Sequence, residues 1–164
     1  MRKQIVKVSE QLKHPLFFSA EEFVELPGGH SLSAPPFFIY ELSERERPWI
    51  EEKQGLPFVE REWSQLQSQL EEKFQQRDKK IQLEMKAAIA LFLMKLFWSN
   101  GQPVQLNNWK QNVKKLDIKP VNVEERLEFI FNRPYSYHSY RQVFELMSEQ
   151  EKQVAKYSIL RQKK

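Results

Sequence analysis

The most strongly hydrophobic part of the chain is the segment AAIALFLMKLFW, residues 87–98. Eleven of its twelve side chains are apolar, and Lys95 carries the one charge. The segment is well short of the roughly 20 residues that a helix needs to span a bilayer. A helix that is hydrophobic all round and too short for a membrane is packed among other helices. The pattern therefore predicts a buried central helix at residues 81–98.

An amphipathic helix is predicted on the N-terminal side of this segment, starting near Pro57. Its apolar positions recur in steps of three and four residues, which places them on one face. They are Trp63, Leu66, Leu70 and Phe74. The polar run QQRDKK at residues 75–80 either bends this helix or ends it before Ile81, and the pattern leaves both interpretations open.

The central helix has a clear predicted end at residues 100–103. Asn100 and Gly101 can adopt the left-handed conformation that often follows a helix, and Pro103 prevents an immediate continuation. The next helix is expected in WKQNVKKL, capped by Asn107 or Asn108.

The C-terminal part of the chain predicts three further helices. Asn122 and Glu125 form a cap pair before VEERLEFIF, and a second helix is expected from about Ser139 to Met147. Ser148 and Glu151 match a capping box that would open a last helix running through Val154, Tyr157 and Leu160. The sequence thus predicts an all-α fold, a single-domain bundle of about six helices around the buried central helix. It does not determine the topology of the bundle.

Residues 1–56 differ from the helical domain expected at residues 57–164, because they contain five prolines and three of the four glycines. Ser19 and Glu22 form a capping box that predicts a short helix in AEEFVEL, ended by Pro27 and the glycines after it. The remainder is expected to be an irregular arm packed on the core, so that the whole chain is one folded unit.

The arm contains one segment too apolar to remain in solvent, PPFFIYEL at residues 35–42. We expect it to start extended, because a residue before proline avoids the helical region, and to lie across the helical core. A weaker alternative pairs IVKV at residues 5–8 with FFIY as two strands. Trp49, in a Pro-Trp pair, is expected to anchor the arm to the core, with an exposed docking motif as the alternative.

The composition limits the chemistry. The chain has no cysteine, which rules out disulfides, a thiol nucleophile and cysteine-ligated zinc, and suits the reducing cytoplasm. His14, His30 and His138 are scattered singly, so neither a metal site nor a cofactor site is expected. The start of the chain has no apolar segment of signal-peptide length, and no membrane association is expected.

Charge is distributed unevenly. Residues 41–75 hold five Lys/Arg and nine Asp/Glu, a net charge of −4, whereas residues 76–120 hold nine and three, a net charge of +6. These segments either form ion pairs with each other or leave a basic surface for a partner. If the basic surface is exposed, Lys110, Lys114, Lys115 and Lys119 are the candidate nucleic-acid contacts, with a plain solvated face as the other interpretation.

The densest group of interaction-prone side chains lies in RPYSYHSYR, residues 133–141. Tyrosine and arginine dominate the binding energy of many protein interfaces. The candidate partner-binding residues are Arg133, Tyr135, Tyr137, His138, Tyr140 and Arg141. The alternative is that the tyrosines fill the space where helices meet. Spacing places no carboxylate or nucleophile beside His138, so we do not expect an enzyme.

With these segments in view, the chain resembles the YpoC-like family of small bacterial proteins of the low-GC Gram-positive group. The resemblance rests on the PPFFIYE arm, the Pro-Trp pair, the long apolar helix and the C-terminal stretch VNVEERLEFIFNRPYSYHSYRQVFELMSEQEKQVAKY. It implies an intracellular helical domain and carries over no catalytic residue. Such families are often encoded near DNA repair and replication-initiation proteins, which favours nucleic-acid metabolism only by association.

Together these observations predict a non-enzymatic cytoplasmic protein that acts as an interaction or adaptor domain and binds a protein partner. The alternative is an accessory nucleic-acid-binding protein linked to DNA replication or repair. Nothing in the sequence indicates the oligomeric state.

Overall fold

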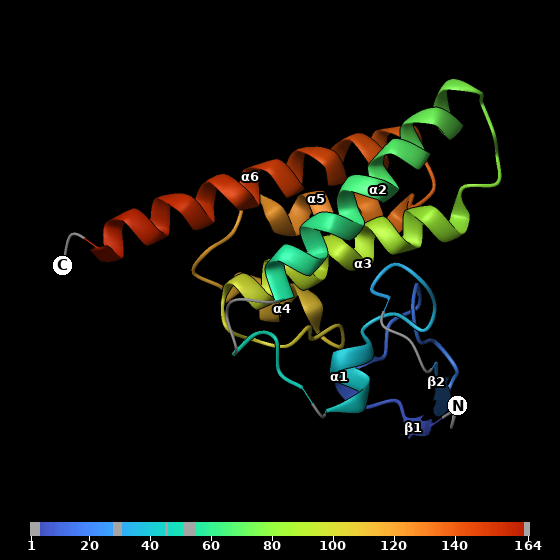
Figure 1. Cartoon of the computed structure of the whole chain (residues 1–164), viewed down its shortest axis with the longest axis horizontal. Helices are drawn as coiled ribbons and strands as arrows, with labels where there is room; N and C mark the ends of the chain where they lie inside the picture. The colour runs from blue at the N-terminus through green and yellow to red at the C-terminus, as the bar shows by residue number, and fades with distance from the viewer. Residues whose placement is uncertain (1–3, 28–30, 45, 51–54, 163–164) are drawn as a thin grey trace.

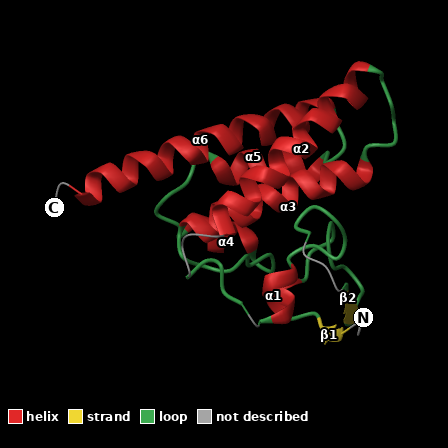
Figure 2. Ribbon diagram, viewed as in Figure 1, coloured by secondary structure: helices red, strands yellow, loops and turns green. Residues whose placement is uncertain are grey.

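A computed structural model describes residues 4–27, 31–44, 46–50 and 55–162, which are mainly helical (Figures 1 and 2). The helices of these ranges are α1 Ile39–Ser43, α2 Gly55–Gln75, α3 Gln82–Ser99, α4 Trp109–Lys114, α5 Val123–Asn132 and α6 Tyr137–Gln162. A 3-10 turn at Glu10–Leu12, η1, and two strands, β1 Gln4–Lys7 and β2 Phe23–Leu26, lie in the N-terminal arm. The expectation of an all-α chain is therefore wrong for this small sheet. Among the described helices, none combines the length and hydrophobicity that a membrane span requires.

Helix α3 lies at the centre of the molecule, as its apolar pattern predicts. Every residue from Ala87 to Trp98 is buried. Helices α2 and α6 make most of the contacts with it and run beside it in Figure 1. Residues of the arm and of α4 and α5 belong to the same hydrophobic core, so α3 is covered on all sides from Ala87 to Trp98.

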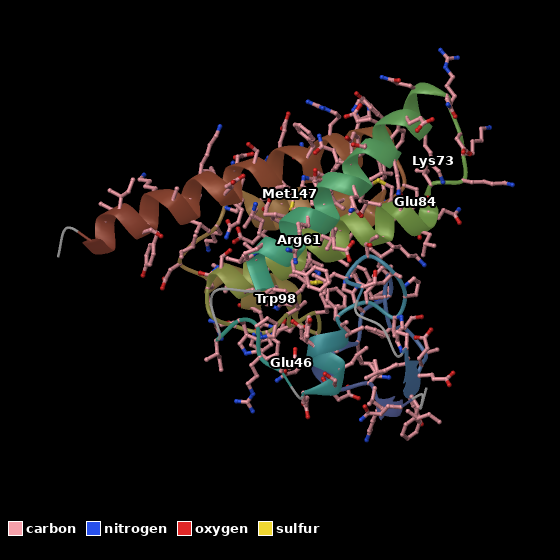
Figure 3. All side chains as sticks on the ribbon, viewed as in Figure 1. Glu46, Arg61, Lys73, Glu84, Trp98 and Met147 are labelled. Carbon is pink, nitrogen blue, oxygen red and sulfur yellow. The ribbon has the colours of Figure 1, made fainter. Side chains whose placement is uncertain are left out.

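The polar run at residues 75–80 ends the preceding helix, because α2 stops at Gln75 and α3 starts at Gln82. An ion pair between Lys73 and Glu84, 2.7 Å apart, joins the two helices beside this turn (Figure 3). At its other end α3 stops as predicted. Gly101 has a φ of +71°, and the amides of Gly101 and Gln102 donate to the carbonyls of Trp98 and Phe97.

Lys95 is the one charged side chain on the buried length of α3, and it is only 5% exposed. Its ammonium group contacts the carboxylate of Glu60 on α2 and donates to the carbonyl oxygen of Met147 on α6 at 3.2 Å. A buried ammonium requires such partners, because an unpaired charge in the interior is very costly. Lys95 therefore links α3 to both of its main neighbours.

The arm begins with two strands, of which the second lies where a helix was predicted. β1 and β2 pair antiparallel, with Val6 opposite Val24. The helix predicted from the capping box at Ser19 is therefore wrong. The alternative pairing of residues 5–8 with FFIY does not occur either, because β1 pairs with β2. In β2, Val24 and Leu26 are covered while Phe23 and Glu25 are exposed, an alternation typical of a half-buried strand. Pairing with β1 satisfies the backbone of both segments.

The rest of the arm lies across the helical core, as predicted. Phe37 and Phe38 are buried, and Phe17 packs edge-on against both rings. His14 contributes a further contact between the arm and α5, because its ring lies 4.5 Å from that of Phe131. Its Nδ1 atom accepts a hydrogen bond from the amide of Leu16 at 3.0 Å.

Several predicted caps are absent. Asn108 and Asn122 precede α4 and α5 with positive φ angles, and their side chains make no capping hydrogen bond. The prediction that a new helix starts at Ser148 is also wrong, because α6 continues through Ser148 and Glu151 without a break. The buried face of α6 extends through Met147 to Gln150, so packing favours a continuous helix over a new start at Ser148.

The titration of His14 gives a stability prediction. Burial lowers the pKa of His14 to about 4 from its ordinary 6.5. Below pH 6.5 the imidazole of His14 binds a proton in the unfolded chain but not in the folded chain. The free energy of unfolding therefore decreases as the pH falls from 6.5 toward 4, by about 3 kcal/mol at most.

His14→Asn removes the titrating group but leaves an amide oxygen within reach of the Leu16 amide. We expect the difference in unfolding free energy between the original chain and this variant, measured by urea denaturation, to shrink steadily from pH 7 to pH 4. Parallel curves for the two proteins would show that His14 is not held neutral by the fold.

Candidate functional site

Three segments that stand apart in the sequence meet at the C-terminal end of α3. The indole of Trp98 is buried there, with the ring of Tyr40 edge-on at 5.9 Å and the ring of Trp49 at 6.4 Å. The first residue of α2, Gly55, lies so close that an added Cβ would sit 3.1 Å from the Trp98 ring and 2.8 Å from the Pro48 Cβ. Trp49 therefore anchors the arm to the core, as predicted, and Trp98 lies between the helical body and α1 (Figure 3).

The polar partner of this aromatic cluster is Glu41 of α1, which is only 7% exposed. Its Oε2 atom accepts two hydrogen bonds, from the indole N–H of Trp98 at 2.7 Å and from the amide of Val104 at 3.0 Å. Its Oε1 atom is buried, and none of the described residues donates to it. Burial raises the pKa of Glu41, and the N–H groups of Val104, of Trp98 and of Glu41 itself offset part of that shift.

A pocket of about 460 Å³ adjoins this carboxyl group. Its lining comes from η1, from the end of α1 and the segment after it, and from the loop after α3. The lining residues are Ser9, Gln11, Leu12, Glu41, Glu44, Arg47, Trp49, Pro103 and Val104. Two walls are tied together, because the carbonyl oxygen of Gln11 accepts from the amides of Leu106 and Asn107. The pocket therefore lies between the arm and the loop after α3, beside the buried carboxyl group of Glu41.

Sequence reasoning missed Glu41. The available signal was one carboxylate inside the otherwise apolar run FFIYEL, at a position that α1 turns toward the core. Its partner Trp98 is 57 residues away, so no local pattern connects the two.

The structure divides the tyrosines of the 133–141 cluster between interior and surface. Tyr140 is buried, and its hydroxyl group donates to the carboxylate of Glu71 on α2 at 2.5 Å. Burial and this carboxylate raise the pKa of Tyr140. Tyr137 is 50% exposed and packs edge-on against Phe74, while Tyr135 is partly covered by the core. Tyr140 thus has the helix-packing role that was the alternative interpretation.

The charged members of the cluster lie nearer the surface. Arg133 and His138 are exposed, and Arg141 stacks over the ring of Phe144 at 4.8 Å. The carbonyl oxygen of Arg133 accepts hydrogen bonds from Ser136 and Ser139, which fixes the start of α6. Partner binding by the exposed residues of the cluster stays a prediction.

The predicted basic surface is partly neutralised by α5. Lys110 pairs with Glu128 at 2.9 Å, and Lys119 pairs with Glu124 at 3.5 Å. Lys114 and Lys115 are exposed. These two pairs use glutamates outside the acidic segment 41–75, whereas the pair of Lys95 with Glu60 joins the basic and acidic segments as the charge distribution suggested.

The C-terminal turns of α6 extend well past the other helices (Figure 1). Three large apolar side chains on these turns are exposed, with Tyr157 at 36% and Ile159 and Leu160 at 55% each. From residue 152 to 164 the sequence has five basic residues and no acidic one. This end of α6 is thus a basic helix that carries uncovered apolar side chains.

Comparison with known proteins gives one family. Residues 53–162 match the family described as YpoC-like protein. A Bacillus subtilis (strain 168) protein with the name Uncharacterized protein YpoC is 34% identical over 112 residues, which are 67% of this chain and 68% of the relative. No solved structure matches the chain. The family match contains helices α2 to α6 with Trp98 and Val104, while Glu41 and Trp49 precede it.

The hydrogen bonds of Glu41 predict an asymmetric effect of substitution. Glu41→Ala leaves two buried N–H groups without an acceptor, and we expect it to lower the unfolding free energy by about 2–4 kcal/mol. Glu41→Gln keeps an oxygen for both donors and should change stability by less than about 1 kcal/mol.

The same pair of proteins tests the raised pKa of Glu41. A raised pKa means that the folded chain holds this proton more tightly, so stability is gained as the pH falls through the folded pKa toward 4.5. The original chain should gain stability relative to Glu41→Gln over that range in urea denaturation. An equal response of both proteins to pH would contradict the buried position of this carboxyl group.

Proposed function

Because the chain belongs to the YpoC-like family, whose matched region is the helical body, we propose that it is a non-enzymatic protein-interaction domain that acts in the cytoplasm. The observation that supports this function is the projecting end of α6. A helix that leaves Ile159 and Leu160 uncovered exposes apolar area that a partner can bury.

The charge of this helix end indicates the kind of partner. Lys152 and Lys156 flank the apolar side chains, and the sequence beyond them adds three more basic residues. Complementary charge favours encounter with an acidic surface. The proposed partner is therefore an acidic protein with an apolar groove that accepts a helix.

The other surfaces support the proposal less strongly. Of the 133–141 cluster, Arg133, Tyr137 and His138 remain available at the opposite end of α6. Nucleic-acid binding is the weaker alternative, because Lys110 and Lys119 already pair with glutamates of α5.

The test compares a variant of the α6 surface with a variant of an exposed position on α3. Each is used in an affinity capture from cell lysate, with bound proteins quantified by mass spectrometry. Ile159→Ser combined with Leu160→Ser should remove the acidic partner by at least tenfold, since apolar contacts at the centre of an interface carry most of its affinity. Leu83→Ser is the matched control, because Leu83 is 52% exposed on α3, and it should retain the partner.

Both substitutions lie on exposed helix positions and should leave stability nearly unchanged. Nuclease treatment of the lysate separates a direct protein contact from one bridged by nucleic acid. Equal capture by the double variant and the Leu83→Ser control would contradict the proposed role of α6, as would loss of capture after nuclease treatment.

A further inference from the structure

The chain contains a single Asn–Gly pair, Asn100–Gly101, at the C-terminal end of α3. An asparagine followed by glycine is especially prone to losing its side-chain amide spontaneously, because glycine has no Cβ to hinder the approach of its backbone nitrogen. Gly101 is exposed and Asn100 is partly exposed, so water reaches both residues. Burial alone therefore does not protect this pair.

We propose that Asn100 is a modification site controlled by the fold: it keeps its amide while the end of α3 is folded and converts to aspartate or isoaspartate when that end opens. In the reaction the backbone nitrogen of Gly101 gives up its proton and attacks Cγ of Asn100. The new C–N bond replaces the bond from Cγ to Nδ2, and the amide group leaves as ammonia with that proton. Water then opens the cyclic imide at either carbonyl group, which gives the two acids.

Three hydrogen bonds hold the side chain of Asn100 away from this reaction. Its Nδ2 atom donates to the carbonyl oxygens of Leu96 at 2.7 Å and of Ile118 at 2.8 Å. Its Oδ1 atom accepts from the amide of Ile118 at 2.8 Å. Turning Cγ toward the Gly101 nitrogen breaks these bonds, and partly buried polar groups that lose a partner make that movement costly.

The backbone at the end of α3 opposes the reaction independently. Asn100 has a ψ of 9°, so the Gly101 nitrogen nearly eclipses the backbone nitrogen of Asn100. Ring closure needs the Gly101 nitrogen on the side of the Cα–C bond that carries Cβ, which requires a large rotation about ψ. That rotation also removes the Gly101 amide from the carbonyl oxygen of Trp98, to which it donates at 3.0 Å. The site therefore reacts only after the helix end has opened.

The product does not fit where the amide was. A carboxylate has no N–H to donate, so the carbonyl oxygens of Leu96 and Ile118 would face its negative charge. Isoaspartate in addition lengthens the backbone by one carbon atom at the position where α3 ends. Conversion therefore prevents this helix end from re-forming with Ile118, and an opening that lasts long enough to react leaves a permanent chemical mark.

The experiment incubates the full chain at mildly alkaline pH, with one sample folded and the other unfolded in guanidinium chloride. Trypsin then releases residues 96–110 as one peptide, because Lys95 and Lys110 are the flanking cleavage sites. Mass spectrometry with fragmentation follows the conversion of Asn100. We expect this conversion to be faster in the unfolded sample by about tenfold or more, since chemical modification proceeds through the unfolded state.

Two controls separate the effect of the fold from the effect of the solvent. The free peptide of residues 96–110 cannot pack as α3 does, and it should convert at the same rate with and without guanidinium chloride. Asn107 and Asn108 lie in the same peptide and are not followed by glycine. They should convert much more slowly than Asn100 in the unfolded chain.

A pair of variants tests the effect of the product on the fold. Asn100→Asp supplies one of the two acids, and it should unfold at a clearly lower guanidinium concentration than the original chain. Asn107→Asp is the matched control, because it makes the same change of charge at an exposed position in the loop after α3, and its midpoint should be nearly unchanged.

The proposal is overturned if Asn100 converts equally fast in the folded and unfolded chain, if it keeps its amide in the unfolded chain, or if Asn100→Asp is as stable as Asn107→Asp. Because the rate comparison uses the original chain, it decides the matter even if Asn100→Asp fails to fold.

Discussion

The burial of α3 on every side is the constraint on which the rest of the structure depends. Complete burial of one large apolar side chain stabilises a fold by about 1.5–3 kcal/mol, and α3 buries several of them between Ile89 and Trp98. Helices α2 and α6 alone cannot surround a helix, so the arm and the segments after α3 must complete its cover. The irregular N-terminal segment is therefore part of the core, although its sequence predicts little regular structure.

The two polar groups on this buried helix determine where charged side chains enter the interior. Lys95 forms an ion pair with Glu60 of α2, and the indole N–H of Trp98 donates a hydrogen bond to Glu41 of the arm. Each pairing satisfies a donor that the apolar surroundings would otherwise leave without an acceptor. The Glu41 pairing leaves the second carboxylate oxygen buried without a donor among the described residues.

Local sequence patterns predicted those features that local physics decides. The apolar run of α3, its end at Gly101, the anchoring role of Trp49 and the arm's position across the core all follow from residue type and spacing. The strand β2 did not, because a capping box at Ser19 competes with a pairing to β1 that only the tertiary structure supplies. Ser148 likewise reads as a helix start, but the buried face of α6 continues through it.

The candidate site was less accessible to sequence reasoning than the fold. In the 133–141 cluster, sequence reasoning left partner binding and helix packing open for the tyrosines, and the structure shows helix packing for Tyr140. Glu41 gave only the weak signal of an acid among apolar neighbours, since its partner Trp98 is distant in the chain. A buried polar group that depends on such a long-range contact becomes visible only with the fold.

Native-state hydrogen exchange in increasing urea tests most directly the claim that the arm is an integral part of the core around α3. If the claim holds, the amides of Leu42 in α1 and Leu106 beside η1 will exchange with the same opening free energy and urea dependence as those of Leu91 and Leu93 in α3. Exchange of these two amides through a separate opening of much lower free energy, with α3 still protected, would contradict it.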